Sequence, residues 1–310
     1  MSTRKVVTRV QTSVKEQRTQ EQGPPSENPV PASDVSAATL PGGTGRNQDW
    51  SVTDVPGALV VLDGATSWLP QDPEKDGGWF ARTLGTTLSD LLRTGSGDLS
   101  NILFQALVTM QKRYDLDPIH SPTSTVAILR WDTGIVEGLV LADSPIVVRT
   151  QDDTDVLEDG RLAAVAAEQR SACTEHLRAG LGFGGTFRDL LQRLQLEERR
   201  WRNRPGGFWV AGGVPEAAEH AITTSWPREQ VTLAAALTDG AAAGVLDYGL
   251  DDWTTLCAKL LKGTPADVIH DVESAELNDP EGLRWPRTKR HDDKTIGLVR
   301  FGTGTVGPDC

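Results

Sequence analysis

The sequence has few of the residues from which several common kinds of site are built. Only three cysteines (Cys173, Cys257 and Cys310) and five histidines occur in 310 residues. The cysteines are far apart and form no CxxC pair, so neither a disulfide scaffold nor a cysteine-bound zinc ion is expected. The histidines show no HExxH spacing, which argues against a histidine-rich metal site.

Long hydrophobic runs and positive charge are also scarce. No apolar run reaches the length of a transmembrane helix, and the N-terminus lacks the apolar core of a signal peptide. Lys and Arg number 31 against 43 Asp and Glu, which gives a net charge of -12. Nucleic-acid binding needs clustered Lys and Arg, so this balance argues against it. We therefore expect a cytoplasmic monomer that binds neither nucleic acid nor a membrane.

The overall composition indicates one globular domain, preceded by an N-terminal segment of different composition. Apolar residues make up 38% of the chain and charged residues 24%, as is usual for a folded protein. Residues 1–32 are rich in Gln, Ser, Thr and Pro, and are predicted to be a disordered basic leader. A single domain is predicted over residues 33–304, followed by a short flexible tail over residues 305–310.

Hydrophobic periodicity predicts both kinds of regular structure. Strands are expected at residues 35–40, 51–61 (through a turn at 55–57), 124–130, 135–140, 206–210, 231–237 and 295–301, and helices at 79–92, 101–113, 161–180, 187–204, 244–250, 252–261 and 265–276. Asp132-Thr133-Gly134 between two strands is a hairpin signal, and consecutive strands favour antiparallel pairing. The sequence thus predicts an α+β domain of antiparallel sheets with helices packed outside them.

An aspartate lies at the end of several of these apolar runs. Residues 58–67 (ALVVLDGATS) indicate a buried strand that ends in a tight turn at Asp63. Similar breaks occur at Asp143, Asp239 and Asp292. Aspartate often serves only to form a turn, but its recurrence suggests carboxylates that converge on one site. Oxygen ligands of this kind are those that Mg²⁺ and Mn²⁺ prefer.

Six short segments, in order along the chain, resemble motifs of the PP2C/PPM family of metal-dependent serine/threonine phosphatases, in its bacterial form. They are NQD (47–49), VLDGAT (61–66), PTSTVAIL (122–129), LADS (141–144), LTDG (237–240) and DDKT (292–295). The resemblance implies an α-β-β-α sandwich of two antiparallel sheets flanked by helices, with two Mn²⁺ or Mg²⁺ ions at one edge. It also implies hydrolysis of phosphate monoesters on proteins by a metal-activated water.

Matching the motifs assigns expected roles to individual residues. The resemblance implies a metal site formed by Asp63, the Gly64 carbonyl, Asp239, Asp292, Asp143 and Asp49. Within this set, Asp49 corresponds to the acid that supports the ligands, and Asp143 to the aspartate associated with a third, weaker ion. Asp63 would bridge the two main ions.

The chain departs from the family pattern where phosphate would bind. The usual DGHGG or DGMGG is DGATS here, and Gly77-Gly78 follow only after an insertion. Thr44 occupies the position of the family's phosphate-binding arginine. Arg46, two residues later, could instead bind two phosphate oxygens through its guanidinium. Pro145 stands where an arginine often follows the aspartate motif.

Two functions stay open at this point. The first is an active phosphatase of phosphorylated proteins, with Asp63, Asp239, Asp292 and Arg46 as its catalytic residues. The second is a catalytically impaired PP2C-like module that docks a protein partner, a reading favoured by the altered loop. Retention of the three aspartates disfavours the second, because clustered carboxylates without a cation repel one another.

Overall fold

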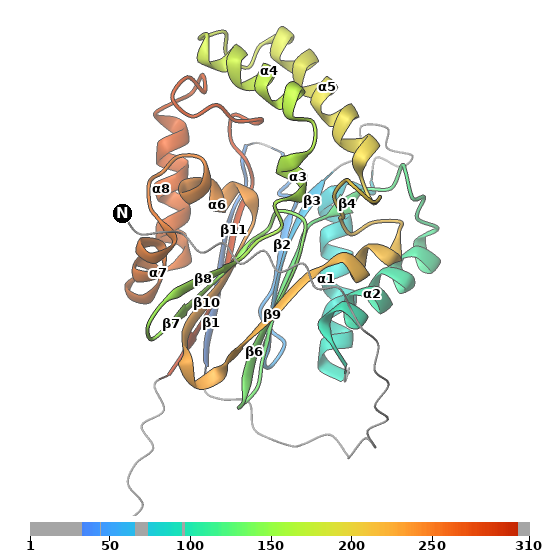
Figure 1. The fold of residues 1–310 in the computed structure, drawn as a ribbon, viewed down its shortest axis with the longest axis vertical. Helices are drawn as coiled ribbons and strands as arrows, with labels where there is room; N and C mark the ends of the chain where they lie inside the picture. Colours follow the sequence, from blue (N-terminus) through green and yellow to red (C-terminus); the bar gives the residue numbers. More distant parts are fainter. Residues whose placement is uncertain (1–32, 44, 66–73, 95–96, 303–310) are drawn as a thin grey trace, which may run out of the picture.

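Two antiparallel sheets lie face to face in the computed structural model, which describes residues 33–43, 45–65, 74–94 and 97–302 (Figure 1). One sheet has the order β1 (Ser33–Leu40), β11 (Lys294–Phe301), β10 (Val231–Leu237), β7 (Ile146–Thr150) and β8 (Thr154–Leu157). The other has the order β2 (Asp49–Val52), β3 (Ala58–Ala65), β5 (Val126–Trp131), β6 (Ile135–Leu141) and β9 (Ile222–Pro227), and β4 (Thr123–Ser124) also pairs with β3.

The period-two pattern of β3 explains how the layers stack. Leu59 and Val61 point into the apolar core between the sheets, together with Val299 of β11. Val60 and Leu62 point the other way, into a core shared with helices. A strand whose two faces are both covered has no polar alternation, which is why the sequence of β3 is almost continuously apolar.

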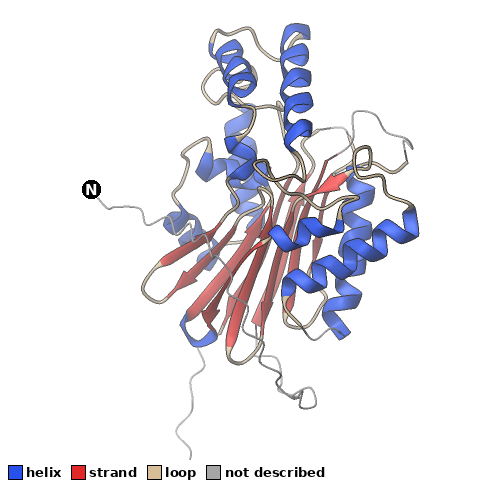
Figure 2. Cartoon of the chain, turned by 45° about the vertical axis from the view of Figure 1, so that its right-hand side comes forward, coloured by secondary structure: helices blue, strands red, loops and turns tan. Residues whose placement is uncertain are grey.

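Helices cover both outer faces of the sandwich (Figure 2). α1 (Gly77–Thr94) and α2 (Leu99–Tyr114) pack on the sheet of β3, while α6 (Asp239–Leu246), α7 (Trp253–Lys262) and α8 (Pro265–Leu277) pack on the sheet of β10 and β11. α8 begins in a capping box of Thr264 and Asp267, which satisfies backbone N–H groups that a helix start leaves unpaired. Among the described residues, no helix combines the length and apolarity needed to cross a membrane.

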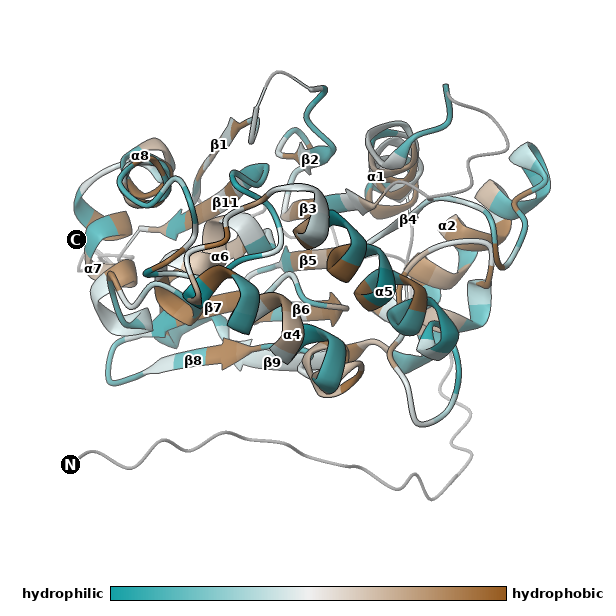
Figure 3. Cartoon of the chain, turned by 90° about the horizontal axis from the view of Figure 1, so that it is seen from above, coloured by the Kyte–Doolittle hydropathy of each residue, from teal (hydrophilic) through white to brown (hydrophobic). Residues whose placement is uncertain are grey.

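A helical hairpin rises from one end of the sandwich, above the place where β3 pairs with β4 (Figure 1). It follows the short α3 (Arg161–Ala164) and consists of α4 (Ala167–Arg178) and α5 (Gly185–Trp201). The two helices share a small core of their own, with Cys173, Leu177, Phe187 and Leu194 buried. Figure 3 looks down on this end and shows α5 with alternating hydrophilic and hydrophobic colours, as expected for a helix packed along one side.

The predicted fold class, an α+β sandwich of two antiparallel sheets flanked by helices, is confirmed. The turn predicted at residues 55–57 is confirmed and separates β2 from β3. Other element predictions are wrong. Residues 206–210, expected as a strand, make only an isolated bridge at Phe208. The helix expected at 244–250 instead begins at Asp239, and the helix expected at 161–180 breaks at Ala166, whose φ is 55°.

The predicted leader and tail, Thr44, and Thr66-Ser67 of the DGATS segment lie outside the described residues. The boundaries at residues 32 and 305 therefore stay predictions. Two short 3₁₀ helices, η1 (Pro215–His220) and η2 (Arg228–Gln230), complete the described elements.

A close backbone contact joins β3 to α1 and yields a test of the fold. A Cβ atom added to Gly77 would lie 2.6 Å from the carbonyl carbon of Gly64 and 2.7 Å from the nitrogen of Ala65. We expect Gly77→Ala to lower the free energy of unfolding by about 1–3 kcal/mol, since rigid backbone must shift. Urea denaturation measures this change. Gly43→Ala is the matched control, because a Cβ at Gly43 meets nothing within 4 Å; equal stability of the two variants would contradict the contact.

Candidate metal centre

Asp63 lies within β3, directly opposite Asp49 of β2 in the antiparallel ladder. The predicted tight turn at Asp63-Gly64 is therefore wrong, because both residues are paired with neighbouring strands. The Asp63 N–H donates to Thr125 Oγ1 at 3.1 Å, and the Asp63 carbonyl accepts from the Thr125 N–H at 2.9 Å. Like charges opposite one another destabilise a ladder, so the pair calls for a compensating positive charge.

Gly77 and Gly78, which follow the insertion, lie next to β3 and the segment before β2. A Cβ on Gly64 would lie 2.2 Å from the Gly77 carbonyl oxygen, and a Cβ on Gly78 would lie 3.0 Å from the Asn47 carbonyl oxygen. The Gly64 N–H donates to the Gln48 carbonyl at 3.1 Å. Gly77 and Gly78 thus pack against the NQD and DG segments in space, although the insertion separates them in sequence.

Asp239 and Asp292 lie at the ends of neighbouring strands of the other sheet. Asp239 is the first residue of α6, directly after β10, and Asp292 precedes β11. A Cβ on Gly240 would lie 3.0 Å from the Cβ of Asp292 and 2.1 Å from the Asp293 carbonyl oxygen. Only glycine allows this approach, which brings the two segments together.

Two threonines connect Asp49 to the same strand ends. Thr238 Oγ1 donates to Asp49 Oδ2 at 3.0 Å and accepts from the Thr295 N–H at 2.9 Å. The other carboxylate oxygen of Asp49, Oδ1, is buried and has no hydrogen-bond partner among the described residues. A buried acceptor without a partner costs free energy, and a bound cation or an ordered water would satisfy it.

Electrostatic repulsion from Asp239 is shared by all the other acids of the cluster. Burial and repulsion from Asp239 raise the pKa of Asp63 well above its ordinary value. Burial, opposed by a hydrogen bond from Thr295, raises the pKa of Asp49 to about 8. Burial and Asp239 raise the pKa of Asp292 to about 6. Both burial and like charge disfavour the ionised form of a carboxyl group, and a nearby cation would offset both effects.

Part of that charge is supplied by a lysine that sequence analysis did not single out. Lys289 Nζ forms an ion pair with Asp292 Oδ1 at 2.5 Å. The partial loss of solvent around its ammonium lowers the pKa of Lys289, but attraction by Asp292, Asp63 and Asp239 outweighs this effect and raises that pKa above its ordinary value. The only sequence signal was the basic run RTKR at residues 287–290, just before the DDKT segment.

Asp143 lies where the helical hairpin meets the sandwich. The turn that carries it contains Ala142 with a φ of 66°, and the Ala142 N–H donates to buried Asp159 at 3.1 Å. Burial, repulsion from Asp239 and repulsion from Glu198 of α5 are among the causes that raise the pKa of Asp143 to about 7. Ser144 Oγ shares a 2.6 Å hydrogen bond with Thr125 Oγ1, which links this turn to Asp63.

Asp293 shapes the loop that carries Arg46. Its two carboxylate oxygens accept from the Gly42 N–H and the Gln48 N–H, each at 2.8 Å. The loop from Gly42 to Gln48 is therefore tied at both ends to the DDKT segment, and Arg46 lies exposed between these ties. Sequence analysis missed this role for the second aspartate of the DD pair.

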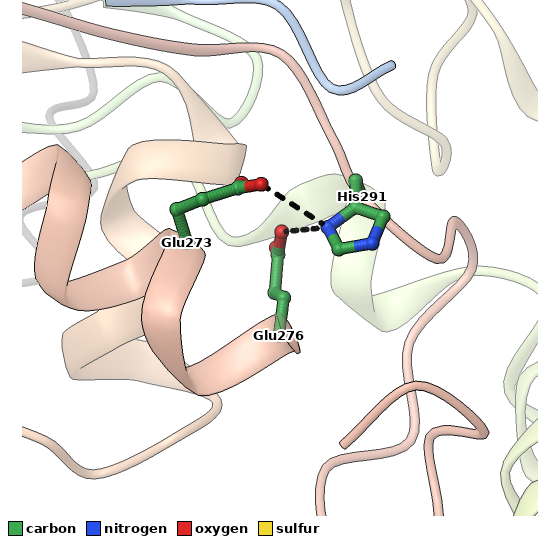
Figure 4. Close-up of side chains that lie close together, drawn as sticks. All are labelled: Glu273, Glu276 and His291. Carbon is green, nitrogen blue, oxygen red and sulfur yellow. Dashed lines mark hydrogen bonds and ion pairs between the residues drawn. The ribbon is translucent and has the colours of Figure 1, made fainter. Parts of the chain in front are cut away.

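A separate acidic group, shown in Figure 4, packs beside the DDKT segment. Glu273, Glu276 and His291 form the only trio of His, Cys, Asp or Glu in the described part of the chain whose ligand atoms all lie within 4.8 Å of one another. Lys294, fully buried, donates to Glu273 at 3.0 Å and lies 2.7 Å from Glu276. A buried ammonium therefore already pairs with both glutamates, so we assign this group to the packing of β11 on α8.

The structure thus brings Asp49, Asp63, Asp239, Asp292 and Asp143 into one electrostatic cluster, beside Gly64. No three of these carboxylates have oxygens that all lie within 4.8 Å of one another. The donor chemistry nevertheless fits a divalent cation, because carboxylate oxygens gather at one edge and the buried Asp49 keeps an unpaired oxygen.

The buried cysteines and the groove of the helical hairpin are separate from the aspartate cluster. Burial raises the pKa of Cys257 to about 12 and also raises that of Cys173, so both thiols are protonated at neutral pH. A groove of about 340 Å³ lies between α4 and α5. It is lined by Glu168, Gln169, Ala172, Leu190, Arg193, Leu196, Glu197 and Arg200, and by none of the clustered aspartates.

The fold matches those of bacterial serine/threonine phosphatases and of a bacterial regulatory protein. Stp1 from Staphylococcus aureus matches with a TM-score of 0.53 and 12% identity, over 90% of this chain and 99% of that one. PppA, described as a regulatory component of type VI secretion in Pseudomonas aeruginosa, matches with a TM-score of 0.54 and 17% identity, over 88% and 99%. PstP/Ppp from Mycobacterium tuberculosis gives 0.51 and 12%, over 87% and 98%.

No protein-family model matches the sequence, and no curated protein matches it. The structural matches span nearly the whole length of those proteins at 11–17% identity. They show that this chain has the PP2C/PPM fold in a divergent form.

The raised pKa values predict an unusual pH dependence for the metal-free protein. An unfolded aspartate has a pKa of about 4, whereas folding raises that of Asp292 to about 6, Asp143 to about 7 and Asp49 to about 8. The folded state therefore binds more protons in this interval, so stability falls as pH rises from about 4 to about 8. Thermal unfolding in EDTA at a series of pH values should show a falling melting temperature.

Asp49→Asn should flatten this fall between about pH 6 and 8, because it removes the carboxyl with the pKa of about 8. The exposed Asp90 of α1 provides the control, and Asp90→Asn should retain the wild-type slope. A melting temperature that rises between about pH 4 and pH 8 would show that ionisation of these aspartates does not destabilise the folded protein.

Proposed function

We propose that this chain, which has the PP2C/PPM fold, is a metal-dependent phosphatase that hydrolyses phosphoserine and phosphothreonine on protein substrates. The observation that carries the proposal is the cluster of aspartates around Asp239, of which Asp49 is buried and the others are partly buried. It occupies the edge where Asp49 faces Asp63 across a ladder and where α6 and β11 begin. No phosphate-binding cysteine or Ser-His-Asp arrangement offers a competing chemistry in the sequence.

Asp63, Asp239 and Asp292 would hold two Mn²⁺ or Mg²⁺ ions, and the carbonyl of Gly64 would add a ligand. Such ions lower the pKa of a bound water and stabilise charge on phosphoryl oxygens. Asp49 would hold its neighbours in place through Thr238, which donates to it at 3.0 Å. Asp143 would bind a third ion more weakly.

Side chains of the protein would position the phosphate of the substrate and compensate its negative charge. The ties from Asp293 to Gly42 and Gln48 fix both ends of the loop that carries Arg46. A guanidinium on this loop would bind two phosphate oxygens at once. The helical hairpin, whose Glu198 acts on Asp143, lies where a protein substrate would approach the cluster.

A second candidate function is a regulatory module that binds a protein partner without turnover. The ion pair of Lys289 with Asp292 at 2.5 Å favours it, because an ammonium already compensates one expected metal ligand. The two functions differ in turnover: only the phosphatase releases phosphate from a substrate when Mn²⁺ is bound.

The central prediction is Mn²⁺-dependent hydrolysis of p-nitrophenyl phosphate and of a phosphothreonine peptide, abolished by EDTA. Asp63→Asn and Asp239→Asn should each lower kcat/KM by about 100-fold or more, as expected when charge stabilisation is removed from a phosphoryl transfer site. Phosphate release measures the rate, and Asp90→Asn should retain wild-type activity. Calorimetric binding of Mn²⁺ with no turnover on either compound would instead favour the regulatory module.

Arg46→Gln provides a separate test of the phosphate site. Loss of a charge-assisted hydrogen bond to phosphate should lower kcat/KM by about tenfold or more, while the Mn²⁺ affinity stays unchanged. Arg113→Gln, at an exposed position in the last turn of α2, is the control. An Arg46→Gln enzyme with wild-type kcat/KM would remove Arg46 from the proposed site.

A further inference from the structure

We propose that Lys289 is an internal competitor of the divalent cation: its ammonium holds the Asp292 carboxylate in the metal-free protein and must leave that oxygen before a metal ion can bind there. The proposal rests on the metal centre proposed above. It adds a residue that sets the affinity of that centre, and it concerns a lysine outside the motifs that the sequence shares with known phosphatases.

The first support is the position of the ammonium. Lys289 Nζ lies 2.5 Å from Asp292 Oδ1. The same oxygen also accepts from the Asp293 N–H at 2.8 Å. An oxygen that binds a divalent cation cannot at the same time keep a close contact with an ammonium, because the two positive charges repel each other strongly at such separations.

The second support is the way in which the chain presents Lys289. The segment between α8 and β11 has no regular structure, but Asp279 anchors it by accepting from the N–H groups of Leu283, Arg284 and Trp285 at 2.9–3.2 Å. Arg287 adds an ion pair to Asp279 at 3.1 Å, with both side chains 8% exposed. The segment is therefore held in place, and Lys289 follows this anchor by two residues.

The third support is the pairing of the cations near Lys289. Arg287 pairs with Asp279, Arg290 with Glu281 at 3.4 Å, and Lys294, the first residue of β11, with Glu273 and Glu276. Among the described residues of the segment, Lys289 is the cation that pairs with an expected metal ligand. Its side chain is 53% exposed, so it can move into solvent when the carboxylate takes another partner.

These observations predict two opposite effects of removing the charge. Without metal, Lys289→Met leaves the aspartates with more uncompensated repulsion, which lowers stability. With metal, the same change removes a repelling charge and strengthens binding. A merely structural ion pair would give the first effect without the second.

Isothermal titration with Mn²⁺ on the full chain tests the proposal. We expect Lys289→Met to lower the dissociation constant by about tenfold or more, as loss of one adjacent positive charge implies. Lys289→Arg keeps the charge and should bind nearly as weakly as the wild type. Lys262→Met, at an exposed position in the last turn of α7, is the matched control and should change nothing.

Thermal unfolding gives a second readout that does not depend on catalysis. In EDTA, Lys289→Met should melt below the wild type, whereas in saturating Mn²⁺ the two should melt at similar temperatures. The rise in melting temperature on adding Mn²⁺ is then larger for the variant, since tighter binding to the folded state stabilises it more at the same Mn²⁺ concentration.

The outcomes separate this inference from the proposed function. If wild type and Lys289→Met bind Mn²⁺ with the same affinity, the competitor role is wrong while the metal centre stands. If Lys289→Met binds more weakly, Lys289 supports the site rather than competing for it, and the inference is overturned. If none of the proteins binds Mn²⁺, both the metal centre and the competitor role are wrong.

Discussion

Repulsion among carboxylates packed at one edge of the sandwich is the constraint on which this end of the molecule depends. Burial, together with repulsion from Asp239, raises the pKa of five other aspartates: Asp49, Asp63, Asp143, Asp247 and Asp292. Packing negative charge into a low-dielectric site is costly, and hydrogen bonds from Thr238 and Thr295 offset only part of that cost. The ammonium of Lys289 offsets another part. The negative charge that these groups leave uncompensated is the electrostatic basis for a cation site.

The backbone makes this concentration of charge possible. The β2–β3 register sets Asp49 opposite Asp63, and the β10–β11 register brings the segments of Asp239 and Asp292 side by side. Where two segments must approach most closely, glycine removes the side chain that would collide, as at Gly64 and Gly240. These contacts tie β3 to α1 and the start of α6 to the segment before β11.

The Glu273–Glu276 pair and the aspartate cluster lie next to each other, and their negative charges are compensated by different lysines. Lys294 is fully buried and pairs with Glu273 and Glu276, so that group serves packing. Lys289 pairs with Asp292 from a half-exposed position. An ammonium that is buried on all sides acts as a fixed counter-ion, whereas one at the surface can exchange with a stronger cation. The difference in burial separates a structural network from a candidate binding site.

The sequence by itself determined the sandwich of antiparallel sheets, most of its strands and helices, and the aspartates that gather at its edge. These follow from local periodicity and from short motifs, which depend on neighbours in the chain. Only the tertiary structure decided the pairing of Asp63 with Asp49, the return of Gly77 and Gly78 across the insertion, and the ties from Asp293 to the Arg46 loop. It also brought Lys289 to Asp292 through a segment without periodicity. Such contacts depend on strand register and on how an irregular segment is anchored, and neither is encoded in a local pattern of residues.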